Sequence, residues 1–256
     1  MRHSRLPVRL GKAPLVDAIF EIRFTSDMPG SNFLPGFLMS KFAGVSNFEK
    51  FPAADIPAPI RQVNPAMRFQ ALFRFQWNDY FFLVGDEVFG VACRLPPYPG
   101  WSNFKPNIIS ALNVLIESNF IKSINRVGLR YIDLIEGNGK SLEEQIKNID
   151  FSISVGQNHV EREPFTLRME IHENGLARAI QVAGPAIANS ADGSTRSGII
   201  IDIDNGMELT NISAPHCLVN LSEWLERIHA DSKTLFFGCL KPEAIEAMEP
   251  TYDRDL

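Results

Sequence analysis

Arginine recurs at the polar positions of segments whose polar and apolar residues alternate. Arg126 and Arg130 lie on either side of Gly128 in a central segment, and Arg23 occupies a similar place in an earlier one. Side chains two residues apart on a strand point to the same face of a sheet, so these arginines are predicted to share one polar face. Because the planar guanidinium group suits phosphate and carboxylate groups, this face is a candidate for holding a partner protein or an anionic ligand.

The alternation assigns twelve polar residues to that face, and six of them are arginine. The set is Glu21, Arg23, Arg68, Gln70, Arg74, Arg126, Arg130, Arg168, Glu170, His172, Asp202 and Asp204. The six arginines form the predicted ligand or partner face. The alternative is that they form ordinary cross-strand ion pairs with the carboxylates, each worth a few tenths of a kcal/mol.

Three of the carboxylates suggest a different chemistry. Asp202 and Asp204 lie two residues apart on one predicted strand, and Glu170 lies on another. Such a group could bind Mg²⁺ for phosphodiester hydrolysis, in which two metal ions about 4 Å apart contact the attacking and leaving oxygens. A metal-dependent nuclease or phosphoesterase is therefore the alternative function.

Other catalytic arrangements find no support in the sequence. His216, Cys217, His229 and Cys239 do not have the spacing of a zinc site, and neither a Gly-x-Ser-x-Gly nor a phosphate-binding Gly-x-x-x-x-Gly-Lys motif occurs. These observations favour a non-catalytic protein without a cofactor.

Composition limits the function further. The chain has 256 residues, 45% of them hydrophobic and 21% charged, which is typical of one large or two small globular domains. A net charge of −5 argues against non-specific binding to nucleic acid or to an anionic membrane. The three cysteines form no CxxC pair, and the sequence has neither a signal-peptide pattern nor a membrane-spanning apolar run. We expect a cytoplasmic protein.

The first half predicts strands at 15–25, 67–76, 80–84 and 88–94, with a helix at 33–42 and a connector containing an edge strand at 48–64. A longer helix is predicted from Trp101 to about Phe120. The second half predicts strands at 124–135, 151–155, 165–172, 176–182 and 198–204. It also predicts a helix at 141–148, a loop at 183–197, a turn at Asn205-Gly206 and a long helix from about Asn220 to Leu240.

Both halves therefore have the order strand, helix, several strands and long helix. We expect an α+β fold in which two similar halves form one curved antiparallel sheet with the long helices on one face. This would be either a saddle like that of TATA-box-binding proteins or a helix-grip arrangement. The expected organisation is an N-terminal arm at 1–13, a first repeat at 14–122 and a second repeat at 123–256, joined in one structural unit.

Four motifs occur in order along the chain: the segment 14–24 containing Ala-Ile-Phe-Glu-Ile-Arg-Phe, Gly-Trp-Ser-Asn-Phe at 100–104, Arg-Val-Gly-Leu-Arg-Tyr-Ile at 126–132 and Ala-Met-Glu-Pro at 247–250. Together they resemble a family of sporadically distributed prokaryotic proteins of unknown function, about 250 residues long. The resemblance implies no activity or catalytic residues. A patchy distribution is compatible with a role in bacterial defence or as mobile-element cargo.

The leading hypothesis is a non-catalytic binding protein that uses the arginine-rich face to hold a partner protein, encoded by a neighbouring gene, or an anionic ligand. A metal-dependent nuclease or phosphoesterase is the first alternative, and a nucleic-acid-binding saddle is the second.

Overall fold

The structure is a computed structural model that describes residues 5–94, 98–155, 158–159, 163–189 and 195–253. A nine-stranded sheet dominates it, and all of its strand pairs are antiparallel. In spatial order its strands are β10 (Phe165–Glu173), β11 (Leu176–Asn189), β12 (Thr195–Ile212), β7 (Ser123–Glu136), β2 (Leu15–Thr25), β6 (Val88–Arg94), β5 (Tyr80–Val84), β4 (Phe73–Trp77) and β3 (Val45–Lys50). The α+β class is thereby confirmed.

The two central strands pair in a register that buries one face and leaves the other polar. Phe20 lies opposite Leu129 and Ile22 opposite Val127, and all four side chains are fully buried. Glu21 lies opposite Gly128 and Arg23 opposite Arg126 on the other face. The period-two alternation of both segments therefore has its expected structural consequence.

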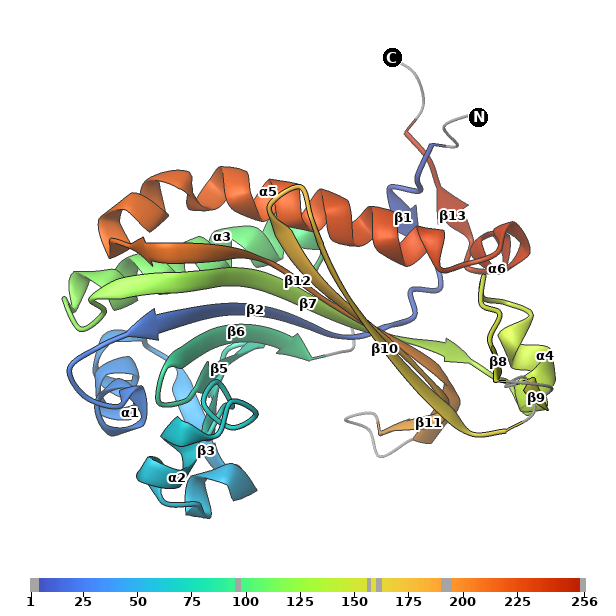
Figure 1. Ribbon diagram of the computed structural model, residues 1–256. Helices are drawn as coiled ribbons and strands as arrows, with labels where there is room; N and C mark the ends of the chain where they lie inside the picture. Colours follow the sequence, from blue (N-terminus) through green and yellow to red (C-terminus); the bar gives the residue numbers. More distant parts are fainter. Residues whose placement is uncertain (1–4, 95–97, 156–157, 160–162, 190–194, 254–256) are drawn as a thin grey trace.

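Two long helices cover the apolar face, α3 (Trp101–Glu117) and α5 (Ala214–Gly238) (Figure 1). They contact each other and the strands β6, β7 and β12. The helix α1 (Gly30–Lys41) buries Leu34 and Leu38 in the same hydrophobic core. We call the opposite side of the sheet the open face.

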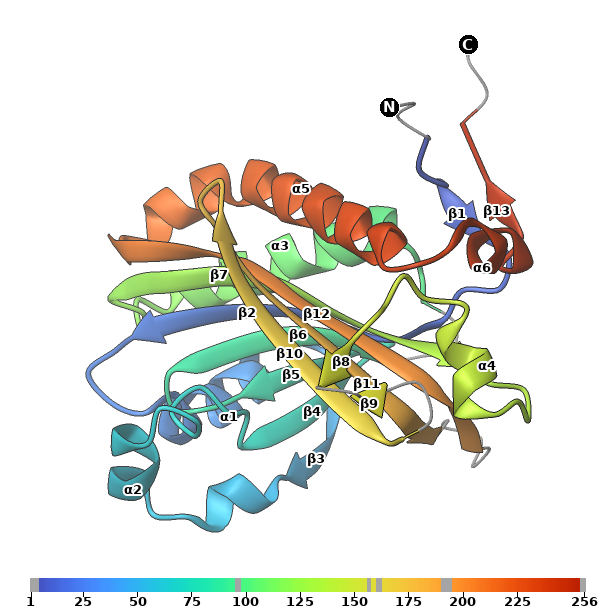
Figure 2. The ribbon, with the colours of Figure 1, turned by 45° about the vertical axis from the view of Figure 1, so that its right-hand side comes forward.

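Shorter elements complete the fold. They are β1 (Arg9–Leu10), the 3-10 helix η1 (Pro52–Asp55), α2 (Ala58–Val63), α4 (Leu142–Ile146), β8 (Ser154–Val155), β9 (Asn158–His159), α6 (Pro242–Ala247) and β13 (Pro250–Thr251). β1 pairs with β13, so residues near both ends of the chain lie side by side (Figures 1 and 2). The expected N-terminal arm is thus held in place at residues 9–10.

Several sequence predictions are confirmed. The strand at 15–25 and the two strands at 80–84 and 88–94 have the predicted bounds, and β7 extends the central strand by one residue at each end. Ser141 caps α4 in a capping box with Glu144. The turn after β10 is a two-residue hairpin at Asn174-Gly175, where both residues have positive φ.

Other predictions are wrong, and hydrogen bonding explains the largest differences. The strand predicted at 67–76 begins only at Phe73, because the Asn64 carbonyl accepts from the amides of Met67 and Arg68 and forms a turn there. Residues 183–189 and 195–197 belong to β11 and β12 instead of a loop, and residues 190–194 lie outside the described part. Asn205-Gly206 continues β12, because the Asn205 side chain donates to Asp231 and Ser232 of α5.

Helix and edge predictions also need correction. α5 begins at Ala214, six residues before the predicted start at Asn220, with Pro215 in its first turn, where proline removes no helical hydrogen bond. α1 begins at Gly30, three residues before the predicted start at Phe33, and contains Pro35 within the helix. Of the strand predicted at 151–155, only Ser154–Val155 forms.

The packing of α3 gives a direct test of the core. Leu112 is fully buried and Asn113 beside it is exposed. We expect Leu112→Ala to lower the free energy of unfolding by about 3 kcal/mol, because it leaves a cavity under the helix. Urea titration followed by circular dichroism measures the change, with Asn113→Ala as the matched control. Equal effects of the two substitutions would contradict this packing.

Candidate functional site

The structure brings four of the six predicted arginines together on the open face. Arg23 comes from β2, Arg126 and Arg130 from β7, and Arg168 from β10. The other two lie further from this group. Arg68, in a turn before β4, pairs with Glu87 at 2.7 Å and lies over the same Phe69 ring as Arg23. Arg74 lies on the open face of β4 and pairs with Glu49 on the edge strand β3.

Arg126 lies at the centre of this face, in a space made by two glycines. A Cβ atom on Gly128 would come within 2.4 Å of the Arg126 guanidinium, and one on Gly206 within 2.8 Å. Gly128 and Gly206 face each other across β7 and β12. The guanidinium therefore lies against the sheet, and the Arg126 side chain is only 4% exposed.

Three carboxylates from two neighbouring strands surround the buried guanidinium. Arg126 contacts Asp204 at 2.7 Å, Glu21 at 3.4 Å and Glu208 at 3.4 Å. Burial alone would lower the pKa of Arg126, but the negative charges of Asp204, Glu21 and Glu208 outweigh it and raise the pKa. Arg126 is thus permanently charged and serves as a cross-strand clamp between β2, β7 and β12.

Its neighbours are paired in a similar way. Arg130 makes two hydrogen bonds to Asp202, of 2.8 and 2.6 Å, and this bonding raises the pKa of Arg130. Arg23 donates to Glu21 at 2.8 Å and stacks on the ring of Phe69. Arg168 contacts Glu170 at 3.0 Å. The alternative interpretation of the arginines, as cross-strand and local ion pairs, therefore describes their contacts.

Beside Arg126 the open face has a hollow of about 160 Å³. Its floor contains small residues, Ala177 and Ala179 on β11, which lie opposite Gly206 and Asp204 on β12. Its walls are charged: Arg168, Glu170 and His172 on β10 line one side, and Arg23, Arg126, Asp204 and Glu208 line the other. The hollow exists because the side chains between two charged rows are short.

The predicted metal ligands are arranged differently from a metal site. Asp202 is paired with Arg130, Asp204 with Arg126, and Glu170 with Arg168. Among the described residues, no group of three or more His, Cys, Asp or Glu side chains could hold a metal ion. This includes the C-terminal stretch, where Cys217 is buried in the core and burial raises its pKa to about 12.

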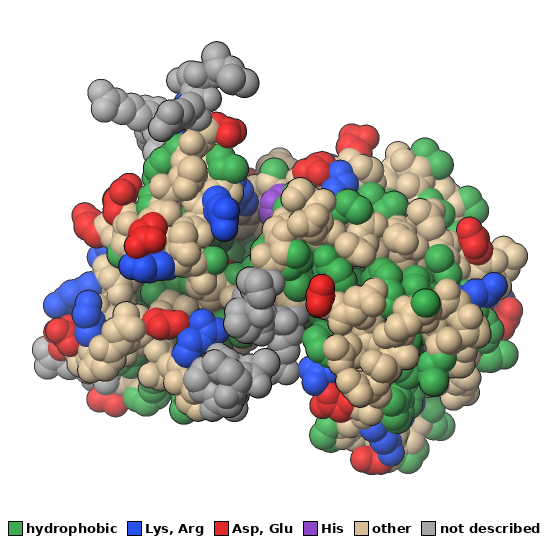
Figure 3. All heavy atoms as spheres, turned by 180° about the vertical axis from the view of Figure 1, so that it is seen from behind, with side chains coloured by type: hydrophobic (Ala, Val, Ile, Leu, Met, Phe, Trp, Pro, Cys, Tyr) green, Lys and Arg blue, Asp and Glu red, His purple; other side chains and the backbone are tan. Residues whose placement is uncertain are grey.

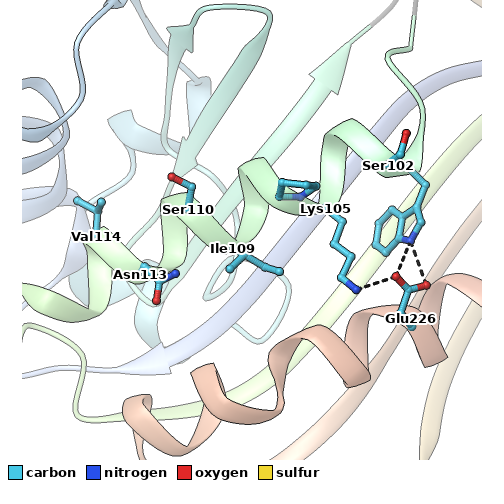
Figure 4. Close-up of a pocket in the computed structure, with 9 residues that line it drawn as sticks. Ser102, Lys105, Ile109, Ser110, Asn113, Val114 and Glu226 are labelled. Carbon is cyan, nitrogen blue, oxygen red and sulfur yellow. Dashed lines mark hydrogen bonds and ion pairs between the residues drawn. The ribbon is translucent and has the colours of Figure 1, made fainter.

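A second hollow, of about 620 Å³, lies on the opposite side of the molecule along α3 and α5 (Figure 4). Glu226 of α5 accepts from the Trp101 indole at 3.2 Å and pairs with Lys105 at 2.7 Å at one end of it. Ile109, Val114 and Pro106 supply apolar surface.

Beneath Trp101 lies a half-buried polar group that the sequence did not predict. The Trp101 ring stacks on His229 at 4.2 Å, and the Tyr131 hydroxyl lies 2.9 Å from His229 Nδ1. Burial lowers the pKa of His229 to about 4, so its ring is neutral at pH 7. These contacts join the start of α3 to α5 and β7. Trp101 near the start of α3 was the one sequence signal for this contact. Its partner, His229, lies more than a hundred residues further along the chain, so the sequence did not connect the two.

The face seen in Figure 3 shows acidic and basic side chains next to one another instead of in separate fields. No helix in the described part of the chain is long and apolar enough to cross a membrane. No protein-family model matches the sequence, and no curated protein is significantly similar to it.

The Arg126 clamp can be tested by its removal. We expect Arg126→Met to lower the free energy of unfolding by about 3 kcal/mol, because three carboxylates then crowd together without their cation. Arg168→Met is the control, since the Arg168 side chain is 51% exposed and its ion pair contributes less than about 1 kcal/mol. Urea titrations measure the free energy of unfolding of both variants. An Arg126→Met protein as stable as the Arg168→Met control would contradict the role of Arg126 as a clamp between strands.

Asp133 makes stability depend on pH. Burial, and then the charge of Asp202, raise the pKa of Asp133 to about 8, whereas an aspartate in an unfolded chain has a pKa of about 3.9. The folded protein therefore retains a proton that the unfolded chain loses between these values, and stability falls as pH rises from about 4 to about 8.

We expect Asp133→Asn to remove the decrease in stability that the titration of Asp133 causes as pH rises. Between pH 5 and pH 8 the free energy of unfolding should fall further for the wild type than for the variant, because asparagine has a similar shape and no titrating proton. Urea titrations of both proteins at the two pH values measure the difference. Parallel pH dependence of the two proteins would show that Asp133 is not protonated in the folded state.

Proposed function

We propose that this chain is a non-catalytic binding protein that holds a partner protein across the open face of its sheet, centred on the hollow beside Arg126. One observation carries the proposal: charged groups of both signs, held in fixed positions by their ion pairs, surround a floor of small residues. A polypeptide can offer donors, acceptors and charges of both signs to such a surface.

The balance of charge favours a protein over an anionic ligand. The four arginines grouped near the centre of this face, Arg23, Arg126, Arg130 and Arg168, are matched by five carboxylates, those of Glu21, Glu170, Asp202, Asp204 and Glu208. An anion would have to displace a carboxylate from each arginine that it approached. The same argument disfavours a nucleic-acid-binding saddle, which needs a cationic surface.

The geometry also favours binding over metal-dependent hydrolysis. A metal ion at Asp202 and Asp204 would have to break the two-point contact with Arg130 and the contact with buried Arg126. Both arginines would then lie close to the metal, and two like charges in a partly buried site repel strongly.

We further propose that the fold consists of two similar halves related by a pseudo-twofold axis, as in TATA-box-binding-protein-like saddles. The strand order supports this, because β2 and β7 pair at the centre and β6 and β12 flank them. An axis through the Glu21–Gly128 pair exchanges Arg23 with Arg130, and it exchanges Gly90 with Gly206. Two long helices on one face fit this arrangement better than a sheet wrapped round a single helix.

The resemblance to a sporadically distributed prokaryotic family, and with it a role in defence or on mobile elements, remains a hypothesis in this proposal. This hypothesis suggests where to search for the partner. A protein without catalytic activity acts through a binding partner, and the neighbouring genes are the first candidates to encode that partner.

Site-specific photocrosslinking in the host cell tests the proposed surface. A photoreactive amino acid replaces Gln181, which points to the open face on β11 beside Asp202. The matched control replaces Asn113, which lines the hollow along α3 and α5. We expect a discrete adduct from position 181 and none from position 113. An adduct from position 113 alone would place the partner on the helical side and overturn the proposal.

A further inference from the structure

Among the described residues, β10 is an edge strand of the sheet with no strand paired on its outer side. This strand pairs with β11 over nine consecutive residue pairs without a bulge, and it is the first strand in the spatial order of the sheet (Figure 2). All of its side chains from Arg168 to Glu173 are exposed. A long, regular and exposed edge presents a row of backbone donors and acceptors to another strand.

The hairpin geometry shows which backbone groups point outward. In a two-residue hairpin the residues next to the turn, here Glu173 and Leu176, form a hydrogen-bonded pair. Odd-numbered residues of β10 therefore bond to β11, and the backbone groups of Thr166, Arg168, Glu170 and His172 point away from the sheet. Within the described part of the chain, these four have no backbone hydrogen bond outside the sheet.

The side chains of β10 are complementary to themselves. In an antiparallel pair of two β10 strands centred on Met169, Arg168 of each copy lies opposite Glu170 of the other. Leu167 then lies opposite Ile171, and Met169 opposite Met169. Shifting the register by two residues in either direction brings Arg168 opposite Arg168 or Glu170 opposite Glu170. Only the centred register pairs opposite charges and places the apolar side chains together.

We propose that two copies of this chain associate through their β10 strands in this register and form one continuous antiparallel sheet. Each copy contributes nine strands to the joined sheet. The hydrogen-bonded pairs at residues 166, 168, 170 and 172 supply about eight backbone hydrogen bonds. The association also covers Met169 and Ile171, which are 44% and 37% exposed in the single chain.

The opposite edge of the sheet shows what a protected edge looks like in the same molecule. β3 pairs with β4 in a register that shifts between Ser46 and Glu49, and Asn47 there has a positive φ of 46°. Such an irregularity prevents another strand from pairing along β3. β10 has no such register shift, which is consistent with an edge strand that pairs with another strand in the assembled protein.

Association through β10 changes the hollow on the open face. Arg168, Glu170 and His172 form its outer wall, and in the dimer the same residues of the second copy lie directly beside them. Each hollow thereby gains charged groups from the other copy, and the two hollows lie on the same side of the joined sheet. This inference is independent of the proposed partner binding, because a single chain already carries the hollow.

Exchange of charges tests both the dimer and its register. Sedimentation velocity of the full chain should show a dimer. Arg168→Glu places Glu opposite Glu170 in both pairs, and Glu170→Arg places two arginines opposite each other, so we expect each single variant to raise the dissociation constant about tenfold or more. The double variant Arg168→Glu/Glu170→Arg restores opposite charges and should restore the dimer.

An equimolar mixture of the two single variants should also form a dimer, because each then supplies the charge that the other lacks. Met169→Lys should give a monomer, and Ser46→Lys on the β3 edge is the matched control that should leave the dimer unchanged. Circular dichroism melting confirms that every variant is folded. A monomeric wild type at about 100 µM, or a double variant as weak as the single ones, would overturn the proposal.

Discussion

The position of one buried cation governs the centre of this molecule. Arg126 lies flat across Gly128 and Gly206, where any larger side chain would collide with it, and carboxylates from β2 and β12 neutralise it. A buried guanidinium is tolerated only with such compensation. The buried charge of Arg126 on β7 therefore requires small residues next to its guanidinium and acidic residues around it on the neighbouring strands. The pairing of β2 with β7 is defined by polar matching on one face and by aromatic and aliphatic packing on the other.

The helical face is held by a second set of polar contacts. Asn205 is completely buried and donates to Asp231 and Ser232 of α5, and Arg178 makes two hydrogen bonds to Asp231. These contacts fix the rotation and position of α5 above β11 and β12. Hydrophobic packing alone is less directional, so the buried polar pairs select one arrangement of helix on sheet. With α5 fixed on one surface, the side chains on the opposite surface of the same strands point away from the helices.

The sequence predicted the class of fold because its strongest signals are local. The alternation in β2 and β7, the stripe of apolar residues in α3 and the Asn174-Gly175 hairpin depend only on neighbouring residues. The turn at Asn64, the strand at Asn205 and the early start of α5 depend on partners far away in the chain, and local patterns missed all three. The same difference applies to the site: periodicity placed Arg23, Arg126, Arg130 and Arg168 on one face. It offered ion pairs with carboxylates only as an alternative and did not show which carboxylate each arginine contacts, because cross-strand neighbours come from distant segments.

The order of strands has a consequence for how the chain folds during synthesis. β2 is made early and can pair with β6 as soon as residue 94 has been made, but its other side is filled only by β7, which ends at Glu136. Until then the future centre of the sheet is an exposed edge whose apolar face carries Phe20, Ile22 and Phe24. Edges of this kind associate with other unfinished chains. The interval between the synthesis of β6 and that of β7 is thus the stage of biogenesis at which a chaperone, or slow translation, would have the largest influence on yield.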